Sequence, residues 1–224
     1  TNAKATMQTL FDTPLYKNHV QSRDNKQTIM LGFSDGTKDG GYLKANWSIH
    51  KTKEVLSQVC KANDVLAIFF DGRGGPPARG GGKTHRFYAA QGKKIANNEI
   101  QITIQGQTIT STYGTKAQFI YNSEQMVTAG LSNYLNQEKN SISKSQRQLL
   151  EQLSEISFKK YDELKNHGKF IPYLEEMSTL KYYGKANIGS RPAKRGKKKQ
   201  LELSDLRAIS FVGSWGQLKQ NVPG

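Results

Sequence analysis

A glycine-rich, cationic segment occupies residues 71–84, where the sequence reads DGRGGPPARGGGKT. It holds six glycines and two arginines, and an apolar run at residues 65–70 (VLAIFF) leads directly into it. Glycines let backbone N–H groups approach an anion closely, and a guanidinium can fork onto phosphate or carboxylate oxygens. We therefore predict an anion site in this glycine loop, formed by Arg73, Arg79, Gly74, Gly75, Gly80 and Gly81.

Two alternatives apply to the glycine loop. An ordinary surface connection is the simpler interpretation, but six glycines and two arginines after a buried strand favour an anion site. The string Gly82-Lys83-Thr84 also suggests a P-loop, whose first glycine would fall at Pro77. Proline has a fixed φ and no N–H to offer a phosphate, so the P-loop remains only an alternative.

A second set of charged residues follows the apolar run at residues 28–33 (TIMLGF). Asp35 and Asp39 flank Lys38 in a polar, glycine-bearing segment, residues 34–41, which we predict to be a loop. A carboxylate at a strand end suits a hard cation such as Mg²⁺, and a lysine there suits a substrate anion. Such residues are common in ordinary turns. Here, however, they follow the predicted strand that comes just before the strand leading to Arg73 and Arg79, and this position favours a role in binding a metal ion or a substrate.

The elements that must position these residues alternate along the chain. Residues 28–33, 65–70 and 99–104 read as strands, whereas residues 42–62, 116–135 and 144–167 have apolar residues at helical spacing. A strand–helix–strand order implies parallel strands, so we predict an α/β fold. The carboxyl ends of parallel strands meet at one edge of a sheet, where ligands bind. The two loops should therefore lie side by side.

Charge is concentrated rather than spread over the 224 residues. Of the net charge of +15, residues 71–94 and 178–201 together contribute +13. Such a surplus suggests an anionic substrate, nucleic acid or a membrane surface. No apolar stretch is long enough to cross a bilayer, and the single cysteine, Cys60, excludes an internal disulfide. A basic loop at residues 189–200 carries Arg191, Lys194 and three consecutive lysines that we expect to be solvated.

Five ordered stretches resemble one family, phosphoenolpyruvate carboxylase. MLGFSDGTKDGG at residues 30–41 is similar to its M-[LI]-G-Y-S-D-S-x-K-D-A-G segment. GRGG and RGGG within residues 72–82, followed by Thr84-His85, are similar to its glycine loop. IQG at 104–106, GSRPAKR at 189–195 and LRAI at 206–209 complete the order.

The resemblance implies an enzyme that adds bicarbonate to phosphoenolpyruvate, giving oxaloacetate and phosphate with Mg²⁺ or Mn²⁺. It implies a single segment, residues 1–224, in the catalytic region of a TIM-type (β/α) barrel with many additional helices. By position, Asp35 would bind the metal, and Lys38, Arg73 and Arg191 would be catalytic. Arg79 and Lys194 would contact the substrate or another anion. The family further implies a cytoplasmic homotetramer under allosteric control.

The chain departs from the family pattern at two informative positions. Asp71 stands where the family has histidine, and Gln107 stands where it has glutamate. A carboxylate at residue 71 would repel an anionic substrate unless it is paired. Because the chain begins without methionine and lacks several family motifs, we expect a fragment that is inactive alone. The alternative function is a basic nucleic-acid-binding domain, whose affinity would fall steeply with salt.

Overall fold

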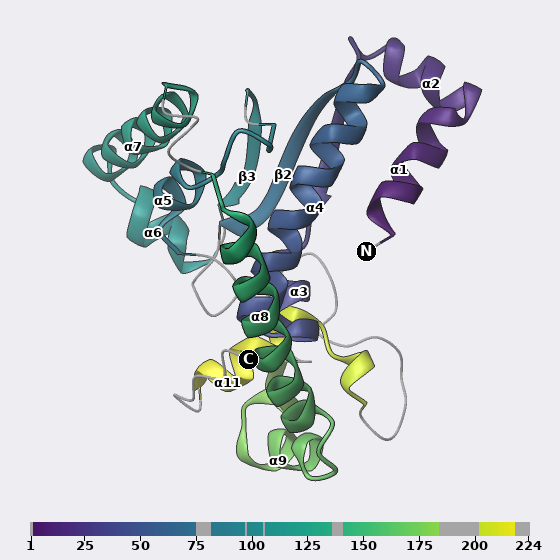
Figure 1. The fold of residues 1–224 in the computed structure, drawn as a ribbon. Coiled ribbons are helices and arrows are strands. Elements are labelled where there is room, and N and C mark those ends of the chain that lie inside the picture. The colour runs from purple at the N-terminus through teal and green to yellow at the C-terminus, as the bar shows by residue number, and fades with distance from the viewer. Residues whose placement is uncertain are drawn as a thin grey trace.

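A three-stranded parallel sheet lies at the centre of the chain (Figure 1). The computed structural model describes residues 2–74, 82–96, 98–104, 106–135, 141–183 and 202–217. The strands are β1 (Lys26–Leu31), β2 (Leu66–Gly74) and β3 (Ile100–Ile104), in the order β1-β2-β3. Both pairings are parallel, and Leu31 is opposite Asp71. The predicted α/β class and parallel strands are therefore confirmed.

One face of the sheet is covered by the long helix α4 (Tyr42–Ala62), whose bounds match the predicted helix. Successive side chains of a strand point to opposite faces, so Ala67 and Phe69 of β2 share the covered face. They pack in the main core with Leu56 and Cys60 of α4. Two further helices contribute to this core: α1 (Ala3–Asp12) packs against α4, and α2 (Pro14–Gln21) packs against α1 and β1. Cys60 is a buried free thiol, and burial raises its pKa to about 11.

The opposite face of the sheet is partly open, although Ile68 of β2 on that face is buried. Along β1 the side chains alternate between exposed and partly buried, and Met30 is 66% exposed on the uncovered face. On β2, Phe70 points the same way and is only partly buried. An apolar strand surface of this kind is the inner surface of a larger sheet or barrel in many α/β proteins. The three described strands alone form neither.

The segment that we predicted to be a polar loop at residues 34–41 is a helix. The helix α3 (Phe33–Gly40) starts directly after β1 and ends at Gly41, whose φ is 76°. Its buried side carries Phe33 and Lys38, so the pattern of one aromatic and one lysine five residues apart was too sparse to indicate it. The loop prediction was therefore wrong, although the position of the segment after β1 was right.

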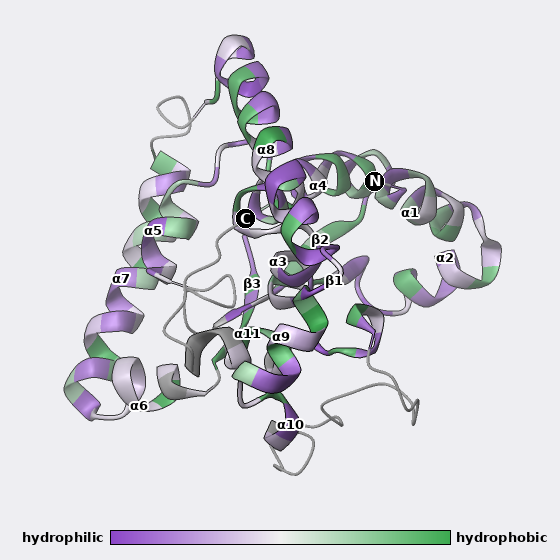
Figure 2. Cartoon of the chain, turned by 90° about the horizontal axis from the view of Figure 1, so that it is seen from below, coloured by the Kyte–Doolittle hydropathy of each residue, from purple (hydrophilic) through white to green (hydrophobic). Residues whose placement is uncertain are grey.

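A second core lies below α3 and is built from the carboxyl-terminal helices (Figure 2). The contributing elements are α8 (Lys144–Lys165), α9 (Phe170–Met177), α10 (Leu180–Tyr183), the 3₁₀ helix η2 (Leu203–Asp205) and α11 (Ala208–Gln217). Tyr161, Phe170, Leu174 and Phe211 form its centre. The helix α11 packs against α3, so this core supports the helix that follows β1.

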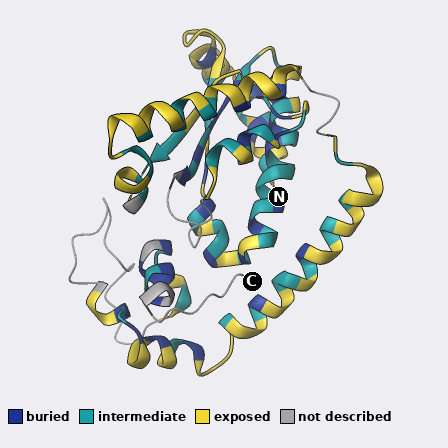
Figure 3. Ribbon diagram, turned by 90° about the vertical axis from the view of Figure 1, so that its left-hand side faces the viewer, coloured by how far each residue is buried: buried dark blue, intermediate teal, exposed yellow. Residues whose placement is uncertain are grey.

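The helix α8 docks on α4 through charged side chains. Glu151 accepts hydrogen bonds from Lys51 Nζ at 2.5 Å and from Trp47 Nε1 at 2.7 Å, and Lys44 Nζ lies 2.6 Å from Glu155 Oε2. The first half of the predicted apolar side does not face a core, because Leu149, Leu153 and Ile156 are 45–60% exposed, whereas Tyr161 further along is buried in the second core (Figure 3). The helix itself was predicted correctly and begins with a Ser143 capping box.

The remaining helices follow the glycine loop and β3. They are α5 (Thr84–Ala89), α6 (Gln107–Tyr113) and α7 (Lys116–Leu135). The bounds predicted for residues 116–135 match α7, but its supposed buried side is exposed, with Val127 at 72% and Leu135 at 69%. Only Ala129 and Asn133 of α7 are buried among the described side chains. The helix α6 was not predicted.

Candidate anion site at the strand ends

The carboxyl ends of β1 and β2 lie side by side and bring two of the predicted segments together. Leu31, the last residue of β1, pairs with Asp71 of β2, and the chain then continues into α3 and towards Arg73. A Cβ atom at Gly72 would stand 3.1 Å from the carbonyl oxygen of Leu31. That separation is too short for a comfortable contact, so glycine suits the close approach of the two strands here.

Arg73 is held in place by aromatic rings. Only 4% of the residue is exposed, and its guanidinium carbon lies 4.0 Å from the ring centre of Phe87 on α5 and 5.8 Å from that of Phe33 on α3. A guanidinium over an aromatic face is attracted by the ring quadrupole. Burial lowers the pKa of Arg73 from its usual value, and nearby Tyr88, Tyr42 and Asp71 oppose that change. Arginine remains a cation under such conditions.

The glycine loop returns to Arg73 at its far end. A Cβ atom at Gly82 would lie 3.9 Å from Nη2 of Arg73, and Gly82 has a φ of 126°. Glycine adopts this backbone region at no steric cost, which other residues do not. The described ends of the loop, Gly74 and Gly82, therefore both lie next to this guanidinium or its strand.

The carboxylate of Asp71 is paired with a lysine and a tyrosine, so its negative charge is compensated beside the anion site. Its Oδ2 atom accepts a hydrogen bond from Lys53 Nζ at 2.7 Å and another from the Tyr88 hydroxyl at 2.8 Å. The aspartate is 0% exposed, Lys53 1% and Tyr88 4%. An unpaired buried carboxylate would be costly, whereas the ammonium and hydroxyl donors at Oδ2 compensate the charge of this one. We call Lys53, Asp71 and Tyr88 the buried triad.

Sequence reasoning missed Lys53 and Tyr88, although a signal for Lys53 exists. Lys53 lies four residues after Ile49 and three before Leu56, so it falls on the apolar side of α4. A lysine in that stripe, facing a strand that ends in aspartate, indicates a buried ion pair. Burial is the main cause that lowers the pKa of Lys53, and Asp71 opposes it.

Lys38 lies in the last turn of α3 and is also buried. Its Nζ atom is 2.8 Å from Asp39 Oδ1, and 10% of its side chain is exposed. The end of α8 fixes this turn, because the Tyr161 hydroxyl donates to the carbonyl of Lys38 at 2.7 Å and Lys165 Nζ donates to the carbonyl of Asp39. The second core therefore determines where the backbone of Lys38 stands.

Asp35, the predicted metal ligand, is exposed in the first turn of α3. Its carboxylate extends over Gly32, where a Cβ atom would be 3.7 Å from Asp35 Oδ2. Among the described residues, no group of three or more histidines, cysteines or acidic side chains is arranged to hold a metal ion. Mg²⁺ prefers about six oxygen ligands, so Asp35 fits such an ion only as one ligand among several.

The other predicted site residues lie outside the described part of the chain. These are Gly75, Arg79, Gly80, Gly81, Arg191 and Lys194, together with the lysines at 197–199. Among the described ones, Arg73 and α3 are brought together through the contact of Arg73 with Phe33. Asp35 and Lys38 share that helix, at its two ends.

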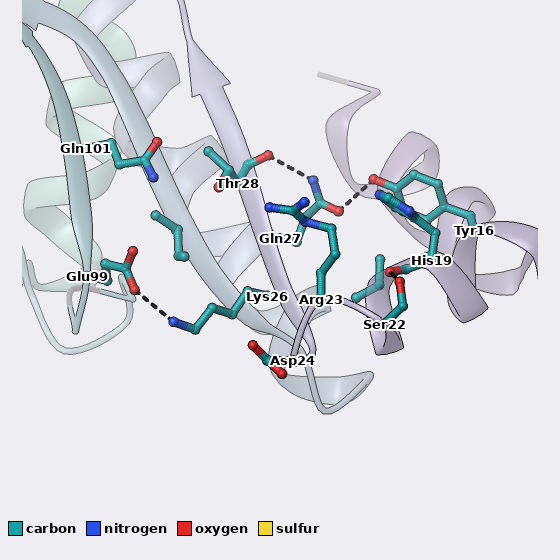
Figure 4. Close-up of a pocket in the computed structure, with 12 residues that line it drawn as sticks. Tyr16, His19, Ser22, Arg23, Asp24, Lys26, Gln27, Thr28, Glu99 and Gln101 are labelled. Atoms are coloured by element: carbon teal, nitrogen blue, oxygen red, sulfur yellow. Dashed lines mark hydrogen bonds and ion pairs between the residues drawn. The ribbon is translucent and has the colours of Figure 1, made fainter.

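A separate cavity of about 510 Å³ opens at the amino-terminal ends of the strands (Figure 4). Its polar lining includes Tyr16, whose hydroxyl is 2.6 Å from Gln27 Oε1, and the ion pair of Lys26 with Glu99 at 3.3 Å. Most of its charged lining residues, such as Arg23 and Asp24, are exposed. It lies at the edge opposite Arg73, and parallel sheets bind ligands at the carboxyl edge.

The chain matches the family model described as phosphoenolpyruvate carboxylase over residues 1–224. The chain belongs to the phosphoenolpyruvate carboxylase family. Similar proteins carrying that name occur in Corynebacterium efficiens, 36% identical over 220 residues, and in Corynebacterium glutamicum, 38% identical over 218. These matches cover 97% and 96% of this chain.

The chain spans about a quarter of the length of these phosphoenolpyruvate carboxylases, covering 24% of the Corynebacterium efficiens protein and 23% of that from Corynebacterium glutamicum. A third relative with the same name, from Corynebacterium diphtheriae, is 35% identical over 221 residues and is covered to 24%. Family membership favours an enzyme over the nucleic-acid-binding alternative. No helix within the described ranges is both long and apolar enough to cross a membrane.

Proposed function

We propose that this chain is part of a carboxylase that adds bicarbonate to phosphoenolpyruvate, releasing oxaloacetate and phosphate. The observation that carries the proposal is the buried Arg73, stacked on Phe87 at the carboxyl end of β2 beside the glycine loop. A fixed cation in a water-poor site stabilises an anion far better than the same cation in bulk water. Membership of the phosphoenolpyruvate carboxylase family supports phosphoenolpyruvate as that anion.

In this proposal the protein grips the phosphate and carboxylate groups of phosphoenolpyruvate rather than attacking them. Arg73 contributes a planar, bidentate donor, and Lys38 contributes a point charge at the end of α3. Arg191, Arg79 and Lys194 and the glycines at 74, 75, 80 and 81 complete the set that we expect to hold substrate oxygens. Positive groups arranged around a transferring phosphoryl group lower the energy of its transition state.

A divalent ion, Mg²⁺ or Mn²⁺, would act as a Lewis acid on a substrate oxygen when it is bound. Asp35 would supply one carboxylate oxygen to it, and its exposed position at the start of α3 leaves room for ligands from the substrate and from other parts of the longer protein. The resemblance to the family also implies a second acidic ligand, a glutamate, for this ion. The motifs of this chain contain no counterpart to it.

The open face of the sheet supports the larger architecture that the family implies. Met30 and the partly buried Phe70 would face inward if further parallel strands closed a TIM-type barrel around them. The exposed apolar sides of α7 and α8 would then be covered as well. We also propose that the complete protein is a cytoplasmic homotetramer under allosteric control, as its family membership suggests.

Replacing Arg73 in the complete protein tests the proposed function. We expect Arg73→Ala to lower kcat/KM for phosphoenolpyruvate by at least about 10²-fold, as the loss of one transition-state donor does in other enzymes. Oxaloacetate formation would be followed through malate dehydrogenase in the presence of Mg²⁺ and bicarbonate. Arg86→Ala is the matched control, because Arg86 is an exposed arginine on α5. Equal activities of the two variants would contradict the role of Arg73, and an inactive unmodified protein would contradict the reaction itself.

A further inference from the structure

The buried triad lies directly behind the guanidinium of the anion site. Asp71 and Arg73 are two residues apart on β2, and both contact α5: the Tyr88 hydroxyl donates to Asp71 Oδ2, and the Arg73 guanidinium stacks on Phe87. Both cations contact the ring of Phe87: Lys53 Nζ lies 5.2 Å and the Arg73 guanidinium carbon 4.0 Å from the ring centre. Three charges therefore share a space from which water is excluded: Lys53, Asp71 and Arg73.

The ion pair of Asp71 is formed with Lys53 and not with the arginine that is closer in sequence. Lys53 Nζ stands 2.7 Å from Asp71 Oδ2, and its approach is guided by the rings of Phe69 and Tyr88 at 5.0 and 5.7 Å. The other carboxylate oxygen, Oδ1, is buried and accepts no hydrogen bond. The negative charge of Asp71 is thus compensated by the lysine of α4.

We propose that Lys53 is a positioning residue, which neutralises Asp71 and thereby keeps the positive charge of Arg73 directed at an anionic substrate. This inference rests on the proposed function, because it concerns the same anion site. Lys53 does not contact the substrate in this account. It acts through Asp71, and the Tyr88 hydroxyl holds that carboxylate in place from α5.

Removing the lysine alone should leave the negative charge of Asp71 uncompensated, so that it weakens the binding of an anionic substrate. In Lys53→Met the buried carboxylate loses its counter-ion at nearly unchanged side-chain volume, and Arg73, which shares the ring of Phe87 with Lys53, is a buried cation that remains beside it. The carboxylate and the substrate then compete for one guanidinium. Removing the carboxylate, in Asp71→Asn, ends the competition and leaves the ammonium of Lys53 nearby. The two single substitutions should therefore move substrate affinity in opposite directions.

The test uses the complete protein and four variants: Lys53→Met, Asp71→Asn, the double variant that carries both, and the control Lys61→Met on the exposed side of α4. For each, the KM for phosphoenolpyruvate and the kcat would be measured, and the dissociation constant would be taken from the rise of Tm with phosphoenolpyruvate concentration. The Tm without ligand reports folding.

We expect Lys53→Met to raise KM and the dissociation constant at least about 10-fold, as 1.4 kcal/mol of lost interaction does. The kcat should change less than these two constants. We expect Asp71→Asn to lower KM, the double variant to return to within about 3-fold of the unmodified protein, and Lys61→Met to match it.

Several outcomes would overturn the inference while leaving the proposed function intact. In an active unmodified protein these are an unchanged KM in Lys53→Met, a rise of KM in Asp71→Asn, or a double variant as impaired as Lys53→Met. If Lys53→Met does not fold, the sign of the change in Asp71→Asn decides, because a purely structural ion pair predicts a loss of affinity there. If the unmodified protein forms no oxaloacetate, the reaction is wrong, and the dissociation constants still judge the role of Lys53.

Discussion

At the residue scale, buried charges in this protein stand next to aromatic rings. Lys53 and Arg73 both lie against Phe87, and His50 stacks on Trp47 with ring centres 5.6 Å apart. Rings give a cation some compensation for lost water while keeping the site dry. The histidine is the one among these whose charge can change near neutral pH, so it makes stability depend on acidity.

His50 should make the folded state weaker in mild acid. Burial is the main cause that lowers its pKa below the usual 6.5, and Arg147 and Lys53 act in the same direction against Glu54. The unfolded chain therefore binds a proton more readily than the folded one between 6.5 and the lower folded pKa. The free energy of unfolding then rises with pH through that window, and the contribution of His50 is fully present above it.

Urea unfolding at several pH values would measure this effect. We expect the unmodified protein to lose stability, relative to His50→Asn, as the pH is lowered from 7.5 to 5, a range from about 1 pH unit above to about 1.5 below an ordinary histidine pKa. His19→Asn is the control, because His19 is exposed on α2. Parallel pH profiles of the unmodified protein and His50→Asn would contradict the assignment.

At the scale of elements, the corner at Gly41 turns the chain from α3, the helix that carries Lys38, into α4. Gly41 ends α3 and begins α4, with φ 76° and ψ 169°. Gly40, its neighbour, is helical, and a Cβ atom there would find only ordinary contacts at 3.8 Å or more. The backbone conformation therefore requires glycine at residue 41 but not at residue 40.

The two glycines give a matched pair of substitutions. We expect Gly41→Ala to lower the free energy of unfolding by at least about 1 kcal/mol, because an L-residue is strained in that backbone region. We expect Gly40→Ala to raise it by about 0.5 kcal/mol, since alanine favours the helix and restricts the unfolded chain. Urea midpoints would show the difference. Equal effects of both substitutions would contradict the account of the corner.

Sequence periodicity identified the long helices but not their surroundings. The bounds of α4 and α7 follow from apolar spacing, whereas α3 is too short and too polar to produce such a signal. The apolar sides of α7 and α8 were predicted correctly as stripes, yet Leu131 and Leu153 are exposed. Periodicity indicates which side of a helix is apolar, but the element that covers this side can come from anywhere in a longer chain.

The parts of the candidate site that depend on local sequence were predictable, whereas those that depend on contacts between elements were not. Arg73 and its loop were evident from composition, because glycines and arginines after an apolar run are unusual. The pairing of Lys53 with Asp71 depends on which side of α4 faces the sheet, and the sequence indicates that side only after the helix and strand are placed together. Arg79 and Arg191 stay predictions.

At the scale of the whole molecule, the described residues hold only part of the proposed catalytic set. They contribute Arg73, Lys38 and one candidate metal carboxylate, Asp35. The relatives are about four times as long, since this chain spans 24% of the first of them. Groups that act together in catalysis lose most of their effect when any member is removed.

Residues 1–224 produced alone should therefore not form oxaloacetate above background. The coupled malate dehydrogenase assay with Mg²⁺, bicarbonate and phosphoenolpyruvate would measure this, with the complete protein as the positive control. Weak binding of the substrate by the isolated chain is compatible with this expectation. Clear turnover by the isolated chain would show that the missing ligands are not required, and would contradict the incomplete metal site described for Asp35.

The exposed edges and open face of the sheet also affect how readily copies of the isolated chain associate. In the described part of the chain it ends at β1 on one side and at β3 on the other, and Met30 is exposed on its open face. Edge strands with an apolar face invite pairing between copies, while a net charge of +15 keeps copies apart. Salt shortens the range of that repulsion to about 10 Å at 0.1 M and leaves the apolar attraction in place. Added salt should therefore drive copies of the isolated chain together, whereas it would release a nucleic-acid-binding protein from its ligand.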